Sequence, residues 1–144
     1  MTDVMRVGVR EAGGLGKAAQ HGPAETVAQL MEALSQGRLD DALALYEPQA
    51  TMLAEPGKPV TGTAALRQAL QGFINLRPTV NSERHAVTQT GDVALYSSQW
   101  TLAGTGPDGH PVTMQGRSAD ILRRQPDGRW LIVVDNPWGT AILG

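Results

Sequence analysis

Asp120 is the residue of this chain whose type and position most favour chemistry. It lies in the middle of an apparent strand, where an acidic side chain is disfavoured unless it has a purpose. Strand alternation places Ser118 and Leu122 on the same face as Asp120. The competing structural interpretation is an ion pair with a nearby arginine. The candidates for that ion pair are Arg84, Arg117 and Arg123.

Asp135 is the second acidic candidate. It ends the last predicted strand, in the order Val133-Val134-Asp135-Asn136-Pro137. A carboxylate at a strand end can act as a general base if a substrate proton comes within hydrogen-bond reach. Asp-Asn-Pro is also a turn signal, and we favour that structural role for Asp135.

His85 is the third candidate, as a general base. Alternation places Glu83 and Val87 on its strand face, so that Glu83 would orient the imidazole. The alternative is a half-exposed histidine without a role. His21 lies in the N-terminal segment and His110 in a turn, so the three histidines do not converge on a metal site.

Composition excludes several classes of function. The chain of 144 residues has no cysteine, which excludes disulfides and thiolate zinc sites. Twelve Lys and Arg against fourteen Asp and Glu argue against a nucleic-acid-binding protein. No Gly-rich phosphate loop is present, and no apolar stretch reaches the ~20 residues of a membrane span. We therefore expect a cytoplasmic protein with no metal, no cofactor, no nucleic-acid partner and no membrane contact.

Three helices are predicted to begin the folded part. Residues 1–22 are rich in glycine and are expected to form a flexible or extended arm. Pro23 opens a helix that ends near Gln36, before Gly37. A second helix is expected over Leu39–Glu47 and is stopped by Pro48. Thr63 is expected to cap a third helix, whose inner face carries Leu66, Leu70, Phe73 and Ile74.

Strands dominate the rest of the chain. A short strand is expected at Ala50–Ala54, followed by a loop through residues 55–59. Four longer strands are separated by turns that contain glycine. They are predicted at Val80–Gln89, Val93–Ala103, Pro111–Arg124 and Arg129–Asn136. Three helices followed by a meander of antiparallel strands indicate an α+β domain over residues 23–138, with 139–144 as a tail.

Three segments resemble the nuclear transport factor 2-like superfamily, in particular its SnoaL-like and ketosteroid isomerase-like members. They are Ala33–Met52, with its Gly-x-Leu-Asp turn between two helices, Gly62-Thr63-Ala64-Ala65-Leu66, and the final hairpin Leu122–Val133. The resemblance covers residues 24–137. It implies a cone of three helices and a curved, mostly antiparallel sheet of the cystatin-like type, with a conical apolar pocket. The same scaffold carries enzymes and non-enzymatic association modules, so function must be argued from the site.

The resemblance also assigns roles to single residues. Asp120 falls where ketosteroid isomerases carry a neutral aspartic acid that donates a hydrogen bond to the developing enolate, a known example of a carboxyl with a raised pKa. Their oxyanion tyrosine matches Leu30, which has no hydroxyl. Their general base matches Ala54 or, with a one-residue gap, Glu55, although an exposed loop glutamate is the commoner outcome. Steroid isomerase activity is therefore not expected.

The leading hypothesis is a pocket for a small, apolar, carbonyl-bearing ligand. If the protein is an enzyme, its chemistry is acid/base isomerisation, cyclisation or hydration, with Asp120 as polariser and Asp135, His85 or Glu55 as base. The expected lining residues are Leu30, Leu34, Tyr46, Met52, Phe73, Trp100 and Ser118. Trp100 lines either the pocket or an interface on the outer sheet face. The alternative is a non-enzymatic association module, and in both cases a homodimer through the sheet is expected.

Overall fold

The computed structural model describes residues 22–144, which form three α-helices, seven strands and a C-terminal 3-10 helix. The predicted arm lies outside the described residues, except for Gly22. The elements are α2 (Pro23–Gln36), α3 (Leu39–Leu43), β1 (Tyr46–Glu55), β2 (Lys58–Thr61), α4 (Thr63–Ile74), β3 (Thr79–Thr90), β4 (Val93–Thr105), β5 (Pro111–Arg117), β6 (Asp120–Arg124), β7 (Trp130–Asp135) and η2 (Gly139–Leu143).

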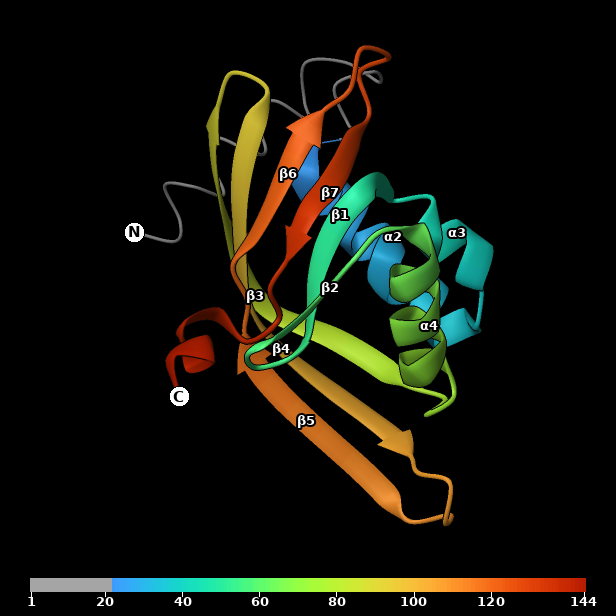
Figure 1. Cartoon of the computed structure of the whole chain (residues 1–144). Coiled ribbons are helices and arrows are strands. Elements are labelled where there is room, and N and C mark those ends of the chain that lie inside the picture. The colour runs from blue at the N-terminus through green and yellow to red at the C-terminus, as the bar shows by residue number, and fades with distance from the viewer. Residues whose placement is uncertain (1–21) are drawn as a thin grey trace.

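The helices cover one face of a strongly curved sheet (Figure 1). The strand order is β2-β1-β7-β6-β4-β3, and β5 pairs with β4 beyond β6. Neighbouring strands are antiparallel except for β1 and β7, which run parallel. The α+β cone with a mostly antiparallel sheet is therefore confirmed. The core lies between the helices and the concave face of this sheet.

Helix α2 begins and ends where the sequence predicts. The backbone N–H of Gly22 donates to Glu25 Oε1 at 2.9 Å, and Pro23 occupies the first turn. Gly37 ends the helix with φ at 71°, in the left-handed region that favours glycine. The buried face carries Val27, Leu30 and Ala33, and it directs this helix onto the sheet.

The predicted cap of α4 is wrong. Gly62, and not Thr63, is the N-cap residue, and it makes no side-chain capping bond. The Thr63 hydroxyl instead donates to the carbonyl oxygen of Pro48, at 3.4 Å. The inner face is as expected, since Leu66 and Leu70 are fully buried. Phe73 lies further along the same face and is half-buried.

The second helix is shorter than predicted. It ends at Leu43, and strand β1 begins at Tyr46, inside the segment that the sequence assigns to the helix. Pairing with β7 overrides the helical pattern, because Tyr46 lies opposite Ile132 and the Ile132 N–H donates to the Leu45 carbonyl oxygen at 2.9 Å. Pro48, which has no N–H, lies in the irregular stretch of this pairing. Strand β2 also occupies part of the expected loop.

The predicted strand Pro111–Arg124 is interrupted after Arg117. The Ser118 N–H still donates to the Ser98 carbonyl oxygen of β4, but the next N–H, of Ala119, donates to the carbonyl oxygen of Asn136. The chain thus changes partner between β5 and β6. This interruption brings Asp120 beside the end of β7.

The last strand and the C-terminal residues complete the fold. Trp130, Leu131 and Ile132 are buried, whereas Val133 and Val134 are half-buried, so only the first half of β7 is covered on both faces. The residues assigned to a tail form η2. Within residues 22–144, no helix has both the length and the hydropathy that a membrane span requires.

Candidate functional site

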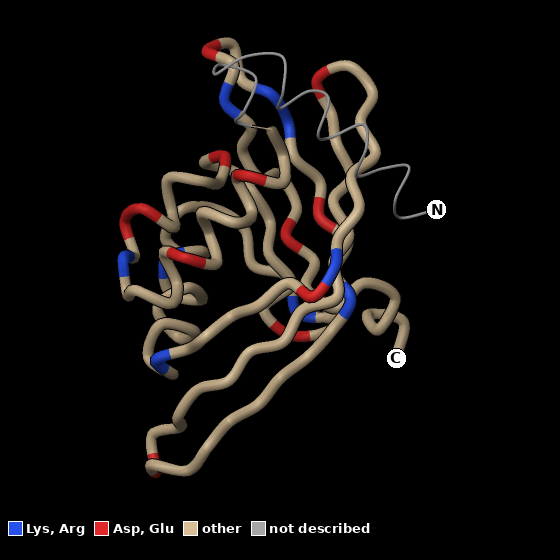
Figure 2. The backbone as a smooth tube through the Cα atoms, turned by 180° about the vertical axis from the view of Figure 1, so that it is seen from behind, with Lys and Arg blue, Asp and Glu red and all other residues tan. Residues whose placement is uncertain are grey.

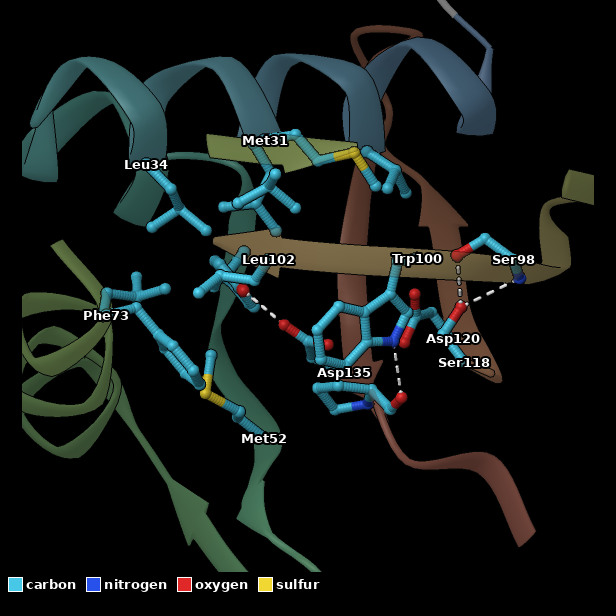
Figure 3. A pocket seen from close by; sticks show the side chains of 16 residues that line it. Met31, Leu34, Met52, Phe73, Ser98, Trp100, Leu102, Ser118, Asp120 and Asp135 are labelled. Atoms are coloured by element: carbon cyan, nitrogen blue, oxygen red, sulfur yellow. Dashed lines mark hydrogen bonds between the residues drawn. The ribbon is translucent and has the colours of Figure 1, made fainter. Parts of the chain in front are cut away.

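An apolar pocket of about 90 Å³ lies between α2, α4 and the concave face of the sheet (Figure 3). Met31, Leu34 and Phe73 form its helical side, and Trp100 and Leu102 of β4 form part of the opposite wall. By this measure a water molecule needs roughly 10–15 Å³. The pocket thus has room for several waters or a ligand on the scale of one ring.

Asp120 and Asp135 lie together at the polar end of this pocket. Asp120 is the first residue of β6 and Asp135 the last of β7, and their exposed fractions are 6% and 8%. The two carboxyl groups lie close enough for the charge of Asp135 to act on the pKa of Asp120. The backbone N–H of Asn136 donates to Asp120 Oδ1 at 2.8 Å. We call Asp120 and Asp135 the carboxyl pair.

Tyr46 completes the hydrogen bonding of the pair. Its phenol donates to Asp135 Oδ2 at 2.5 Å, across 89 positions of sequence. The contact exists because β1 runs parallel to β7, with Met52 opposite Asp135 in the register. A phenol therefore reaches the site from the first strand, whereas the position on α2 that the resemblance implies holds Leu30.

Burial raises the pKa of Asp120 well above its ordinary value, and the charge of Asp135 adds to this effect. Burial also raises the pKa of Asp135, although the hydrogen bonds from Tyr46 and Asp120 oppose the increase. The pKa of Tyr46 is raised well above its ordinary value, by burial and then by Asp135, so the phenol stays neutral. The pair therefore holds a proton to higher pH than ordinary carboxyl groups do, and Asp120 is the member that keeps it.

Two serines lie beside the pair, on β4 and at the break before β6. The hydroxyl groups of Ser98 and Ser118 are 2.9 Å apart, and the Ser98 N–H donates to Ser118 Oγ, also at 2.9 Å. Both side chains are buried, so their hydrogen bonds are satisfied within the fold. They therefore form a fixed polar wall next to the carboxyl pair.

Trp100 lines the pocket and not the outer face of the sheet. Its indole N–H donates to the carbonyl oxygen of Pro137 at 2.7 Å. It packs edge-on against Trp138, whose own N–H donates to the carbonyl oxygen of Leu53 at 2.8 Å. Gly116 lies directly opposite Trp100, and a Cβ there would come within 2.9 Å of the indole.

Asn136, and not Asp135, makes the side-chain hydrogen bonds of the turn that follows β7. Asn136 Oδ1 accepts from the backbone N–H of Trp138 at 3.2 Å, and Asn136 Nδ2 donates to the carbonyl oxygen of Gly139, also at 3.2 Å. The turn role favoured for Asp135 is thus performed by Asn136. Because its backbone N–H also bonds Asp120, Asn136 connects this C-terminal turn to the pair. The sequence Asp-Asn-Pro-Trp at 135–138 is the feature from which this role of Asn136 could have been predicted.

His85 and Glu55 lie away from the carboxyl pair. His85 stacks on Tyr96, with ring centroids 5.5 Å apart, and borders a neighbouring hollow with Arg84 and Arg117, which shares Ser98 and Ser118 with the apolar pocket. Glu55 is exposed and pairs with Lys58 at 3.5 Å, on the turn between β1 and β2. Neither residue lines the apolar pocket.

The predicted pairing of Glu83 with His85 is wrong. A β-bulge lies between Ser82 and Arg84, so the register with β4 shifts by one residue at Glu83. His85 is opposite Ser98, whereas the exposed Glu83 accepts a hydrogen bond from the outward-facing Gln99, at 3.2 Å. The two side chains consequently leave the strand on opposite faces.

All seven side chains expected to line the pocket do so, and the structure adds others. The expected ones are Leu30, Leu34, Tyr46, Met52, Phe73, Trp100 and Ser118. Sequence reasoning missed Ser98 and the hydrogen bond of Tyr46. None of the arginines proposed as an ion-pair partner for Asp120 lines the pocket. Among residues 22–144, no group of three His, Asp or Glu side chains is arranged to hold a metal ion.

The family model for the SnoaL-like domain matches residues 27–133, which include both helical pocket walls, Tyr46 and Asp120. The chain belongs to the SnoaL-like domain family. Asp135 lies just beyond the matched residues, so this SnoaL-like protein completes its carboxyl pair outside the matched region. Among curated proteins, no sequence matches this chain.

Solved structures support the same fold. A candidate association domain of calcium/calmodulin-dependent protein kinase II from Xanthomonas campestris is 20% identical, with a TM-score of 0.71, and the match covers 84% of this chain and 86% of that one. A candidate ketosteroid isomerase from Shewanella frigidimarina is 23% identical, with a TM-score of 0.67 and coverage of 77% and 90%. An epoxide hydrolase/cyclase-like enzyme of pyran ring formation in salinomycin, SalBIII, is 20% identical, with a TM-score of 0.63 and coverage of 78% and 85%. This SnoaL-like protein thus shares the nuclear transport factor 2-like fold.

Proposed function

We propose that the chain binds a small, apolar, carbonyl-bearing molecule in the pocket and performs acid/base chemistry on it. The observation that carries this proposal is the carboxyl pair, two adjoining and buried acids at the polar end of an apolar cavity. Environments that raise carboxyl pKa values are typical of catalytic sites. The candidate isomerase and the cyclase-like enzyme with this fold support an activity of the isomerase, cyclase or hydratase type.

The pair divides the chemistry between its two members. Asp120, which keeps its proton longer, donates it to the carbonyl oxygen of the ligand and stabilises the charge that develops there. Asp135 remains a carboxylate held by the Tyr46 phenol, and it accepts a proton from the carbon next to the carbonyl. Asp135 then returns that proton to a different carbon while the enol oxygen gives its proton back to Asp120. This completes an isomerisation, and the pair ends in its starting protonation state.

The test compares Asp120→Asn and Asp120→Ala with Asp92→Asn as a matched control. Asp92 is exposed and pairs with Arg124 at the surface, so its substitution removes one charge without touching the pocket. Cyclopentanone is the probe, because it is a one-ring ketone of suitable size. We expect Asp120→Ala to weaken its binding about tenfold or more, the magnitude of a lost hydrogen bond to a buried group. Unchanged affinity in both Asp120 variants, with the control behaving as wild type, would contradict the assignment.

A second candidate function is a non-enzymatic association module that dimerises through the outer face of the sheet. Val93 and Leu95 of β4 are 42% and 40% exposed, and these are large apolar side chains for a surface position. The similarity to a candidate kinase association domain supports this alternative. Dimerisation is compatible with ligand binding, because the pocket is lined by the helices and the concave face of the sheet. A dimer without affinity for any one-ring probe would favour the module alone.

A further inference from the structure

The carboxyl pair has more hydrogen-bond acceptors than donors. The four carboxyl oxygens accept hydrogen bonds from the Tyr46 phenol and the Asn136 backbone N–H, and the proton that Asp120 keeps is the one donor of the pair itself. Each carboxyl oxygen can accept two hydrogen bonds. The polar end of the pocket therefore has capacity for further donors. Of the two nearby serine hydroxyls one donates to the other, so a single hydroxyl proton remains there.

The same end of the pocket also lacks a positive charge. None of the pocket-lining side chains is Lys, Arg or His. The pair acts on the pKa of two phenols, Tyr46 on β1 and Tyr96 on β4, and both are neutral over the physiological range. Arg84, His85 and Arg117 line the neighbouring hollow, which shares Ser98 and Ser118 with the pocket, and none of the three lines the pocket itself. The lining residues from α2, α4 and β3 are apolar. Once the pair loses one of its two protons, its negative charge has no cation beside it.

A buried charge without a counter-ion is costly, and a ligand can supply one. An ammonium group brings three N–H donors and a positive charge, which are the two things that the pair lacks. The walls beyond the pair suit an apolar body, because Met31, Leu34 and Phe73 line them. A carboxylate of the same shape would instead bring a second negative charge to the acids.

We propose that the pocket takes a small apolar amine in its protonated form, with the ammonium group on Asp120 and Asp135 and the hydrocarbon body against the helical wall. This inference rests on the proposed function only in using the same pocket as the ligand site, and it does not require catalysis. The proposed reaction needs the proton that the carboxyl pair holds, whereas amine binding needs the negative charge of the pair. The amine therefore competes with a carbonyl-bearing ligand.

The test uses four one-ring probes that differ only in their polar group: cyclopentylamine, cyclopentanol, cyclopentanone and cyclopentanecarboxylate. Binding to the full-length protein is followed by NMR titration near pH 8, where an alkylamine with a pKa like that of lysine is protonated. We expect cyclopentylamine to bind about tenfold more tightly than cyclopentanol, since a hydrogen bond to a charged group exceeds a neutral one by roughly that factor. Cyclopentanecarboxylate is expected to bind least tightly.

Two variants locate the effect. Asp135→Asn is expected to abolish the preference for the amine, whereas Asp92→Asn, which removes one charge at the exposed pair with Arg124, is expected to retain it. Equal affinity for cyclopentylamine and cyclopentanol would overturn the inference, while bound cyclopentanone would still support the proposed function. A preference that persists in both Asp135→Asn and Asp120→Asn would place the amine elsewhere and overturn it as well. Failure of all four probes to bind would overturn both proposals.

Discussion

At the scale of single residues, the carboxyl pair makes the stability of the fold depend on pH. Burial raises the pKa of both Asp120 and Asp135 in the folded state. Between the unfolded value, near 3.9, and the raised folded values, the folded state therefore binds more protons than the unfolded state. The contribution of the pair to the free energy of unfolding is fully present below that window and is lost as pH rises through it.

Asp120→Asn, which cannot ionise, is expected to remove most of this pH dependence. Relative to wild type, the variant should gain stability as pH is raised from about 4 to about 8, because only the wild type then faces the cost of a second buried charge. Urea unfolding of both proteins across that range measures the difference. Glu47 also makes the free energy of unfolding depend on pH, with the opposite sign, because its hydrogen bond with Arg123 lowers its pKa. This contribution is the same in both proteins and cancels in the comparison. A constant difference at every pH would contradict the raised pKa.

The sequence predicted the candidate acids but not what surrounds them. Asp120 is conspicuous because an acid is disfavoured within a strand, and alternation correctly places Ser118 on its face. The hydrogen bond from Tyr46 to Asp135 joins residues 89 positions apart, and local patterns carry no information about such a pair. The helical periodicity of residues 39–46 even assigns Tyr46 to the wrong element.

At the scale of elements, the close approach of β4 and β5 forms one wall of the pocket. Gly116 faces Trp100, and a Cβ at position 116 would lie 2.8 Å from the carbonyl oxygen of Pro137 as well as 2.9 Å from the indole. Real Cβ atoms essentially never come so close, and both neighbours are held by the bond from Trp100 to Pro137. Glycine is therefore required there for space and not for backbone conformation.

Gly116→Ala is expected to cost about 1–3 kcal/mol of stability, the usual range for an overpacked site. It should also weaken binding of cyclopentanone, because the indole must move into the pocket. Gly72→Ala is the control, since Gly72 lies on α4 and a Cβ there meets no atom within 4 Å. Thermal unfolding and the NMR titration are the two measurements. Equal behaviour of the two variants would show that Trp100 is not held in place.

Long strands and the first and third helices follow from periodicity, because each buries one face over many residues. Irregularities within the strands cannot be predicted from periodicity. The bulge at Glu83 and the interruption after Arg117 depend on which backbone groups a strand meets across the sheet, so a sequence without its partner strands cannot place them. These two irregularities decide which candidate residues meet. One separates Glu83 from His85, and the other brings Asp120 to Asp135.

At the scale of the whole molecule, ion pairs border the exposed apolar surface of the sheet. Some ion pairs lie on helices and turns, whereas Arg123 of β6, which is opposite Val93, meets Glu47 of β1; Figure 2 colours the charged positions. On β4, Val93 and Leu95 remain exposed. Burying such side chains stabilises an association by about 25 cal/mol per Å² of apolar surface. This is the surface on which we expect a homodimer.

Leu95→Lys is expected to convert the dimer to a monomer, because two buried ammonium groups would face each other across a symmetric interface. Sedimentation velocity at several concentrations measures the change. Gln68→Lys on α4 adds the same charge at an exposed position on the helical side of the sheet, away from the outer face, and serves as the control. Wild-type protein that sediments as a monomer at all concentrations would contradict the sheet-face dimer.

The two ends of the pocket differ in how firmly they are built. Tyr46, Asn136 and the serine hydroxyls hold the polar end through hydrogen bonds from four separate segments of the chain. Met31 and Leu34 at the opposite end are held by packing alone, and methionine adapts its shape readily. Substitutions on α2 can therefore change the size of molecule accepted while the reacting group stays the same. A line of descendants could come to bind new ligands by altering one helix face, without rebuilding the polar end of the pocket.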